Sequence, residues 1–135
     1  MGIKILLADY NQIVRQGLRT LLAMEPDLEV IAEAENGQTA VRLVRELAPQ
    51  VVIMDLTMPD LHGIEATRQI LGASPGVKVI ALSVYSDRRF VVNILKAGAS
   101  GYLLKDCAFE ELSRAIRAVL VNKTYISPGV SEIVI

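Results

Sequence analysis

The sequence has no tryptophan, and aromatic residues make up only 4% of its 135 residues, so aliphatic side chains must fill any core. Its one cysteine, Cys107, has no partner within the chain, which excludes an internal disulfide and favours a reducing compartment. No apolar run approaches the roughly 20 residues that a membrane-spanning helix needs. The net charge of −1 gives no basic excess for direct binding to nucleic acid. We therefore expect a soluble, cytoplasmic protein that does not enter the membrane.

What the chain does contain is a series of short apolar runs rich in valine, isoleucine and leucine. Runs of this length and composition are typical of strands that are covered on both faces of a parallel sheet. Between them, apolar residues recur at helical spacing and stop at proline or glycine. The pattern predicts five strands, each followed by a helix, with the strands at 3–8, 28–34, 51–55, 77–82 and 101–104.

Five such strand–helix units with short links predict an α/β fold with a parallel sheet and right-handed crossovers. The expected architecture is flavodoxin-like: a five-stranded sheet of order 2-1-3-4-5, flanked by five helices. Residues 28–34 alternate between apolar and polar, which indicates a half-exposed edge strand. In this architecture ligands bind outside the carboxyl ends of the strands, here in the crevice between strands one and three.

The residues that follow four of these runs share one kind of chemistry. Asp9, Asp55, Ser83 and Lys105 each stand at or just after the end of a predicted strand, so we expect them to converge. An aspartate such as Asp55 can accept a phosphoryl group if a divalent cation and fixed donors relieve the charge repulsion. Asp9 and the backbone carbonyl of Thr57 are candidate ligands of Mg²⁺, while Lys105 and Ser83 are candidate partners of the phosphoryl oxygens.

Longer segments around these residues carry a family resemblance. Segments 55–63, 81–83 and 98–106 resemble the receiver domain of bacterial two-component response regulators. Segments 14–19, 104–106 and 125–128 resemble more narrowly the NarL/FixJ subfamily, which places a LuxR-type helix-turn-helix domain after the receiver. The resemblance covers essentially the whole chain.

The resemblance implies a role for each candidate residue. Asp55 would be the phosphoacceptor for a sensor histidine kinase, and Asp9 an acid of the Mg²⁺ site. Lys105 would sense the phosphate, Ser83 would be the switch hydroxyl, and Tyr102 the aromatic side chain that rotates inward with it. The resemblance thus implies a phosphorylation-controlled signalling domain that regulates transcription.

One position departs from the family pattern. The family usually has two consecutive acids at the end of the first strand, and here the second is replaced by Tyr10. Tyrosine is neutral near pH 7 and a poor ligand for Mg²⁺. Two hypotheses follow: a working switch with weak metal affinity, or an atypical pseudo-receiver that acts by phosphorylation-independent protein interaction. The retained Asp55, Ser83 and Lys105 favour the first.

The resemblance also divides the chain. Residues 1–121 are expected to form the receiver domain, and residues 122–135 a turn-rich linker toward a C-terminal helix-turn-helix domain that this chain lacks. DNA contact is expected only through that domain. Arg15 and Arg19, one helical turn apart, indicate a solvated face or a homodimer contact.

Several other residues have simpler interpretations. Asp60 is read as a turn or helix-capping residue, and His62 as a solvated loop histidine, because no second histidine or cysteine stands near it. Enzymes of similar fold fit poorly. A flavodoxin needs a Ser/Thr/Gly-rich phosphate loop after the first strand, and an aspartyl phosphatase needs an acid at position 11, which is Asn11. We therefore do not expect an enzyme.

Overall fold

The computed structural model describes residues 2–58, 60–106 and 108–130. Cys107 and the last five residues of the predicted linker lie outside this part of the chain. Strands and helices alternate along the sequence in this order: β1 (Ile3–Ala8), α1 (Gln12–Ala23), β2 (Leu28–Ala34), α2 (Gly37–Leu47), β3 (Val51–Asp55), α3 (Gly63–Ala73), β4 (Lys78–Ser83), α4 (Arg88–Lys96), β5 (Gly101–Leu104), α5 (Ala108–Leu120) and β6 (Tyr125–Ile126).

The strands form one parallel sheet of order β2-β1-β3-β4-β5-β6, which confirms the predicted α/β class and the order of the first five strands. The predicted number of five strands is wrong, because β6 pairs with β5 inside the segment expected to be a linker. Strand β6 has only two residues, which is too short for an alternating pattern to show in the sequence. The turn before it, where Asn122 has φ +64°, gives the segment the composition of a linker. The predicted edge position of β2 is confirmed.

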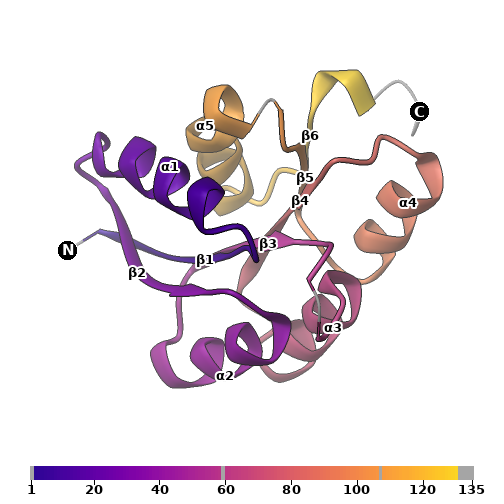
Figure 1. Ribbon diagram of the computed structural model, residues 1–135, viewed down its shortest axis with the longest axis horizontal. Coiled ribbons are helices and arrows are strands. Elements are labelled where there is room, and N and C mark those ends of the chain that lie inside the picture. The colour runs from indigo at the N-terminus through magenta and orange to yellow at the C-terminus, as the bar shows by residue number, and fades with distance from the viewer. Residues whose placement is uncertain (1, 59, 107, 131–135) are drawn as a thin grey trace.

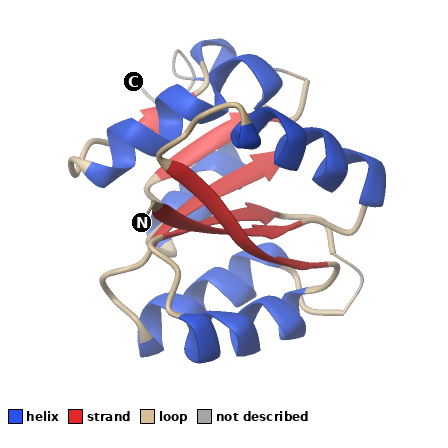
Figure 2. Cartoon of the chain, turned by 90° about the vertical axis from the view of Figure 1, so that its left-hand side faces the viewer, coloured by secondary structure: helices blue, strands red, loops and turns tan. Residues whose placement is uncertain are grey.

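Helices cover both faces of the sheet (Figures 1 and 2). On one face, β1 contributes Ile5 and Leu7 to an apolar cluster with α1 and α5. On the other, Leu6 and Ala8 of the same strand pack in a cluster with residues of α2, α3 and α4. Because successive side chains of a strand point to opposite faces, a continuous apolar run supplies both layers. The sheet is therefore buried on both sides, and polar side chains gather at the ends of its strands.

Local sequence signals place the helix ends beside the strand ends. Asn11 caps α1 by accepting hydrogen bonds from the N–H groups of Ile13 and Val14 at 2.9 and 3.2 Å. Helix α4 ends just before Gly98, whose φ of +109° is a conformation that favours glycine. The Asn11 cap fixes the start of α1 shortly after the candidate residue Asp9. Among the described helices, none is both long and apolar enough to cross a membrane.

Candidate functional site

Two buried aspartates stand side by side at the carboxyl edge of the sheet. β1 pairs with β3 so that Ala8 lies opposite Met54, which brings the next residues, Asp9 and Asp55, to adjacent strand ends. Each of the two acids is only 1% exposed. Burying two carboxylates at one place is costly unless cationic groups compensate them.

Lys105 supplies one such cation. Its backbone N–H donates to the Ser83 carbonyl at 2.8 Å, which fixes the residue at the end of β5. Its Nζ lies 3.2 Å from Asp9 Oδ2 and 3.3 Å from Asp55 Oδ2, with its side chain 20% exposed. The predicted convergence of these three side chains is thus confirmed as geometry.

Thr57 holds the other oxygen of Asp55. The Thr57 N–H donates to Asp55 Oδ1 at 3.0 Å, and the Thr57 hydroxyl donates to the same atom at 3.1 Å. The two hydrogen bonds leave Oδ2 on the side of Lys105. The sequence pattern indicates a role only for the carbonyl of Thr57, so the contact of its hydroxyl is an addition from the structure. A threonine two residues after a strand-end aspartate is a recognisable turn signal that could have indicated this contact.

Asp9 is the less compensated of the two acids. Its Oδ1 accepts the N–H of Asn11 at 2.8 Å, whereas its Oδ2 accepts no hydrogen bond from the described residues and has only the Lys105 ion pair. Burial raises the pKa of Asp9, and the charge of Asp55 raises it further, against the opposing effects of the Asn11 N–H and Lys105. The negative charge of the ionised Asp9 carboxylate is therefore only partly compensated, and a bound cation would stabilise it.

The donor set fits Mg²⁺ in part. The carboxylates of Asp9 and Asp55 both face the same lysine nitrogen, so both groups can face one cation, and carboxylate oxygens are ligands that Mg²⁺ prefers. Tyr10, at the position of the expected second acid, is 62% exposed. Within the described residues, no group of three or more His, Cys, Asp or Glu side chains is arranged to hold a metal. Two carboxylates with water ligands suit Mg²⁺, but a three-acid site is not formed.

Ser83, at the end of β4, and Tyr102, in β5, both contact Tyr85 in the loop that follows β4. The buried Ser83 hydroxyl accepts the N–H of Tyr85 at 2.9 Å, and the Tyr102 hydroxyl donates to the Tyr85 carbonyl at 2.5 Å. Burial raises the pKa of Tyr102, and the neighbouring Ser83 hydroxyl lowers it by less. Tyr102 thus points inward, and the described hydrogen bond of Ser83 ties it to the loop rather than to Asp55.

Arg15 takes part in the site, contrary to the interpretation as a solvated face. Its Nη1 donates to the backbone carbonyl of Asp9 at 2.5 Å, its Nε pairs with Glu33 at 3.1 Å, and its side chain is 11% exposed. Arg19 pairs with the same glutamate but remains 53% exposed. The helical spacing did put both arginines on one face. The sequence spacing does not show that this face packs against Glu33 of β2, because that contact depends on the tertiary structure.

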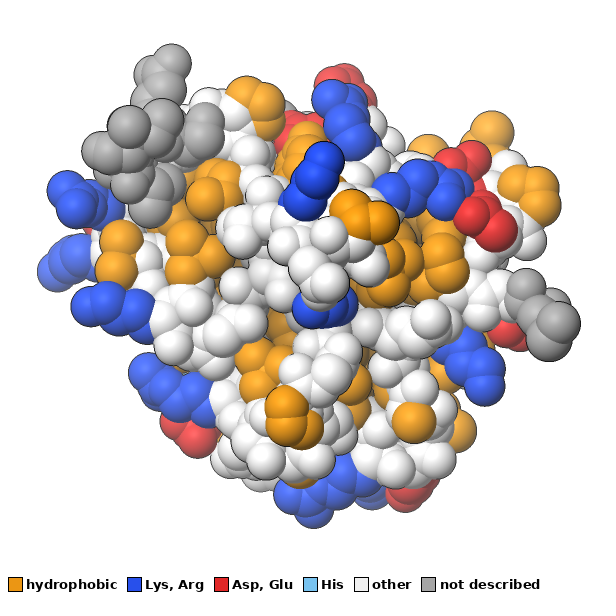
Figure 3. Space-filling view, turned by 180° about the vertical axis from the view of Figure 1, so that it is seen from behind, with side chains coloured by type: hydrophobic (Ala, Val, Ile, Leu, Met, Phe, Trp, Pro, Cys, Tyr) orange, Lys and Arg blue, Asp and Glu red, His pale blue; other side chains and the backbone are white. Residues whose placement is uncertain are grey.

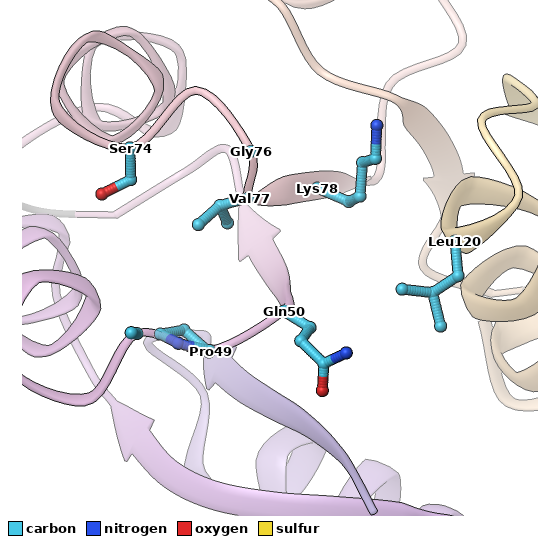
Figure 4. Close-up of a pocket in the computed structure, with 8 residues that line it drawn as sticks. Pro49, Gln50, Ser74, Gly76, Val77, Lys78 and Leu120 are labelled. Atoms are coloured by element: carbon cyan, nitrogen blue, oxygen red, sulfur yellow. The ribbon is translucent and has the colours of Figure 1, made fainter.

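Two other surfaces do not contribute to this site. A cavity of about 400 Å³ lies at the amino ends of β3 and β4, beside Leu120 of α5, at the end of the sheet opposite the acids (Figure 4). Its lysine, Lys78, donates to the Asn122 side chain at 2.8 Å. On the face seen in Figure 3, lysine and arginine side chains are spread over the surface, several of them close together along the left edge, and acidic side chains lie among them. Neither surface has the chemistry of the carboxyl edge.

Comparison with known proteins places this geometry in a family. Residues 5–117 match the model of the response regulator receiver domain. The chain is 43% identical over 130 residues to the transcriptional regulatory protein DegU of Brevibacillus brevis, which covers 96% of the chain and 55% of DegU. It is 39% identical over 130 residues to the response regulator GacA of Pseudomonas aeruginosa, covering 96% and 61%. The chain therefore spans little more than half the length of these curated relatives.

Solved structures agree with this assignment. A two-component response regulator of the LuxR family from Aurantimonas sp. superposes with a TM-score of 0.93 at 37% identity, over 98% of this chain and 94% of that one. The isolated receiver domain of RcsB from Salmonella enterica serovar Typhimurium, in the presence of the phosphomimetic BeF3⁻, gives a TM-score of 0.89 at 25% identity, over 98% of each chain. The chain belongs to the response regulator receiver domain family, within its NarL/FixJ, LuxR-type branch.

Proposed function

We propose that this domain is phosphorylated on Asp55 by a sensor histidine kinase in the cytoplasm. The observation that carries the proposal is the shared position of Lys105, whose Nζ lies 3.2 and 3.3 Å from the two buried carboxylates. A fixed cation next to a buried carboxylate is what a phosphoryl acceptor needs, because an anion must approach another anion. The family membership supports the same reading.

The chemistry follows from how Asp55 is held. Thr57 engages Oδ1, so Oδ2 is the oxygen that attacks phosphorus. One P–O bond forms to Asp55 while the bond from phosphorus to the donor breaks, and the departing imidazole or carboxylate keeps the bonding electron pair. Asp9, Asp55 and the carbonyl of Thr57 would hold Mg²⁺, which supplies charge neutralisation when bound. Lys105 would pair with the phosphoryl oxygens. The domain takes up one phosphoryl group and is not an enzyme that turns over a substrate.

The consequence of phosphorylation would be a shift between two conformations. Ser83 and Tyr102 both contact Tyr85, so movement of the Ser83 hydroxyl toward a phosphoryl group would disturb the loop that also receives the Tyr102 hydroxyl. Residues 122–135, of which Tyr125 and Ile126 form β6, would relay this shift to a C-terminal DNA-binding domain. The longer relatives support this arrangement, since the chain covers 55% of DegU and 61% of GacA. A homodimer contact of the receiver is a further expected output.

One observation favours a second candidate function. Tyr10 is exposed at the position where the family has a metal-binding acid, which leaves two carboxylates for the metal. If two carboxylates hold Mg²⁺ too weakly, the domain is a pseudo-receiver that binds its partners without phosphorylation.

Measuring the intact mass of the protein after incubation with a small acyl phosphate, with and without Mg²⁺, distinguishes the two candidate functions. We expect one phosphoryl adduct that requires Mg²⁺ and is absent in Asp55→Asn, while Asp106→Asn, an exposed neighbour of Lys105, is labelled normally. Undiminished labelling of Asp55→Asn would remove the proposal. No adduct in the wild type together with labelling of Tyr10→Asp would identify a receiver disabled at its metal site.

A further inference from the structure

The loop between β3 and α3, described at residues 56–58 and 60–62, carries Thr57, and backbone hydrogen bonds hold both of its ends. The N–H of Leu56 donates to Leu82 in β4 at 3.0 Å, and the N–H of Gly63 donates back to Leu56 at 3.2 Å. Gly63 lacks a side chain where a Cβ would lie 2.5 Å from the Asp55 carbonyl, so α3 can begin close to the end of β3.

The middle of the loop is tied to another helix by Asp60. Its Oδ1 accepts the N–H of Gly37 at 2.9 Å, and its Oδ2 accepts the N–H of Gln38 at 3.1 Å. Asp60 was expected to be a turn or capping residue, and it does cap a helix, but α2 rather than the α3 that follows it. Its side chain thereby joins the loop to α2, a helix that does not adjoin the loop in the sequence.

The contact completes the start of α2. The first four N–H groups of a helix lack partners within it. Here Asp60 accepts the first two, the Asn36 side chain accepts that of Thr39 at 2.8 Å, and the Asn36 carbonyl accepts that of Ala40 at 3.1 Å. Asn36 and Asp60 therefore share one helix terminus, but only Asp60 connects it to the loop beside Asp55.

Two further observations support a close and specific junction. A Cβ at Gly37 would collide with the Leu61 carbonyl, so α2 approaches the loop as closely as only glycine allows. Burial raises the pKa of Asp60, but the N–H groups of Leu61, Gln38 and Gly37 outweigh it and hold the pKa below its usual range. Asp60 is thus an ionised double acceptor at neutral pH. The helices that flank the junction, α2 and α3, lie side by side (Figure 1).

We propose that Asp60 is a positioning residue for phosphoryl transfer to Asp55, an inference that rests on the function proposed above. Asp60 anchors the loop to the start of α2, and the loop in turn holds Thr57, whose N–H and hydroxyl orient the Asp55 carboxylate. Asp60 contacts neither Asp55 nor Lys105 in the described structure, so it acts through Thr57. Misplacing a reacting group by about 1 Å can slow a reaction on the order of 100-fold.

The test compares Asp60→Ala, Asp60→Asn and Asn36→Ala with the wild type. Asn36→Ala is the matched control, because it removes a cap from the same terminus of α2 without releasing the loop. We expect phosphoryl uptake from a small acyl phosphate at fixed Mg²⁺ to slow by about tenfold or more in Asp60→Ala. Asp60→Asn, which retains one acceptor oxygen, should recover part of this rate. Asn36→Ala should stay within about twofold of the wild-type rate even where its unfolding stability falls as far as that of Asp60→Ala.

Amide hydrogen exchange of Thr57 provides a readout that needs no phosphorylation. The exchange rate of the Thr57 N–H should rise in Asp60→Ala and stay at the wild-type value in Asn36→Ala, because only the first variant frees the loop. Equal exchange in both variants, or equal uptake rates, would overturn the positioning role. A wild type that takes up no phosphoryl group would overturn the proposed function and, with it, the role of Asp60 in that reaction. The exchange data would then still show whether Asp60 anchors the loop.

Discussion

The ammonium group of Lys105 lies 3.3 Å from the Asp55 carboxylate, although β4 separates the strands that precede these two residues. The long lysine side chain reaches across the end of β4 into a place where two carboxylates are buried. Lys105 thereby compensates charge in the resting domain, in addition to the role toward a phosphoryl group that is proposed for it. Its removal should affect folding stability as well as signalling.

The first prediction concerns Lys105→Met. Breaking a buried ion pair by removing one partner typically costs 3–5 kcal/mol, and because Lys105 is partly exposed we expect a loss of about 3 kcal/mol at pH 7. The loss should be smaller at pH 4.5, because a lower pH favours protonation of Asp9, whose pKa is raised, and this weakens the repulsion between the two carboxyl groups. Urea unfolding at both values of pH measures it. The exposed Lys96→Met is the control, and a loss of equal size at the two pH values would contradict the electrostatic explanation.

The second prediction concerns Asp9 and pH. Because the folded-state pKa of Asp9 is raised, the native protein binds more protons than the unfolded chain between the two pKa values. The contribution of Asp9 to stability is therefore fully present below the ordinary value of 3.8 and is lost as pH rises through the folded-state pKa. In the presence of a chelator, Asp9→Asn should remove this part of the pH dependence.

Unfolding free energy measured against pH, with and without Mg²⁺, checks this prediction. Mg²⁺ binds the ionised carboxylate, so it should reduce the stability loss of the wild type at neutral pH and have less effect on Asp9→Asn. The exposed Asp106→Asn serves as the control for losing one acid. A pH profile of Asp9→Asn that coincides with the wild-type profile in chelator would show that Asp9 is not the group responsible.

Much of the fold and part of the site could be predicted from the sequence. Period and length of the apolar runs predict the strands, and strand order then predicts that Asp9, Asp55 and Lys105 meet, because carboxyl ends of parallel strands share one edge. The rest depends on contacts between distant segments. The Arg15–Glu33 pair joins α1 to β2, and the Asp60 contact joins a loop to α2. Neither arrangement leaves a periodic signal in the sequence, since each depends on how two elements pack.

The third prediction concerns Tyr10. A carboxylate about 4 Å from a cation gains on the order of 1–4 kcal/mol of Coulomb energy, depending on solvent exposure. Tyr10→Asp should therefore raise the affinity for Mg²⁺ by at least about fivefold, which isothermal titration calorimetry can measure. Asn11→Asp is the matched control, because it adds the same charge one residue further on and can still cap α1. An increase of equal size in both variants would indicate a general charge effect rather than a missing ligand.

The fourth prediction concerns Ser127, in the segment that was expected to be a linker. Its fully buried hydroxyl accepts the Leu104 N–H at 3.1 Å, and its own N–H donates to the Tyr102 carbonyl at 2.9 Å, so it extends the contact of β6 with β5. Ser127→Ala leaves the Leu104 N–H without this acceptor, which should cost about 1–3 kcal/mol of unfolding free energy.

Urea unfolding of Ser127→Ala, with Ser113→Ala as the control, measures how firmly this segment belongs to the sheet. The Ser113 hydroxyl donates to Glu25 at 2.7 Å, but in Ser113→Ala the Glu25 carboxylate keeps its ion pair with Arg117 at 3.1 Å. Ser113→Ala should therefore lower the unfolding free energy by less than about 1 kcal/mol. If the two variants lose equal stability, the β6 contact is peripheral. If Ser127→Ala loses more, any movement of β5 near Lys105 and Tyr102 must also move the residues that lead out of the domain, because the same hydrogen bonds join them.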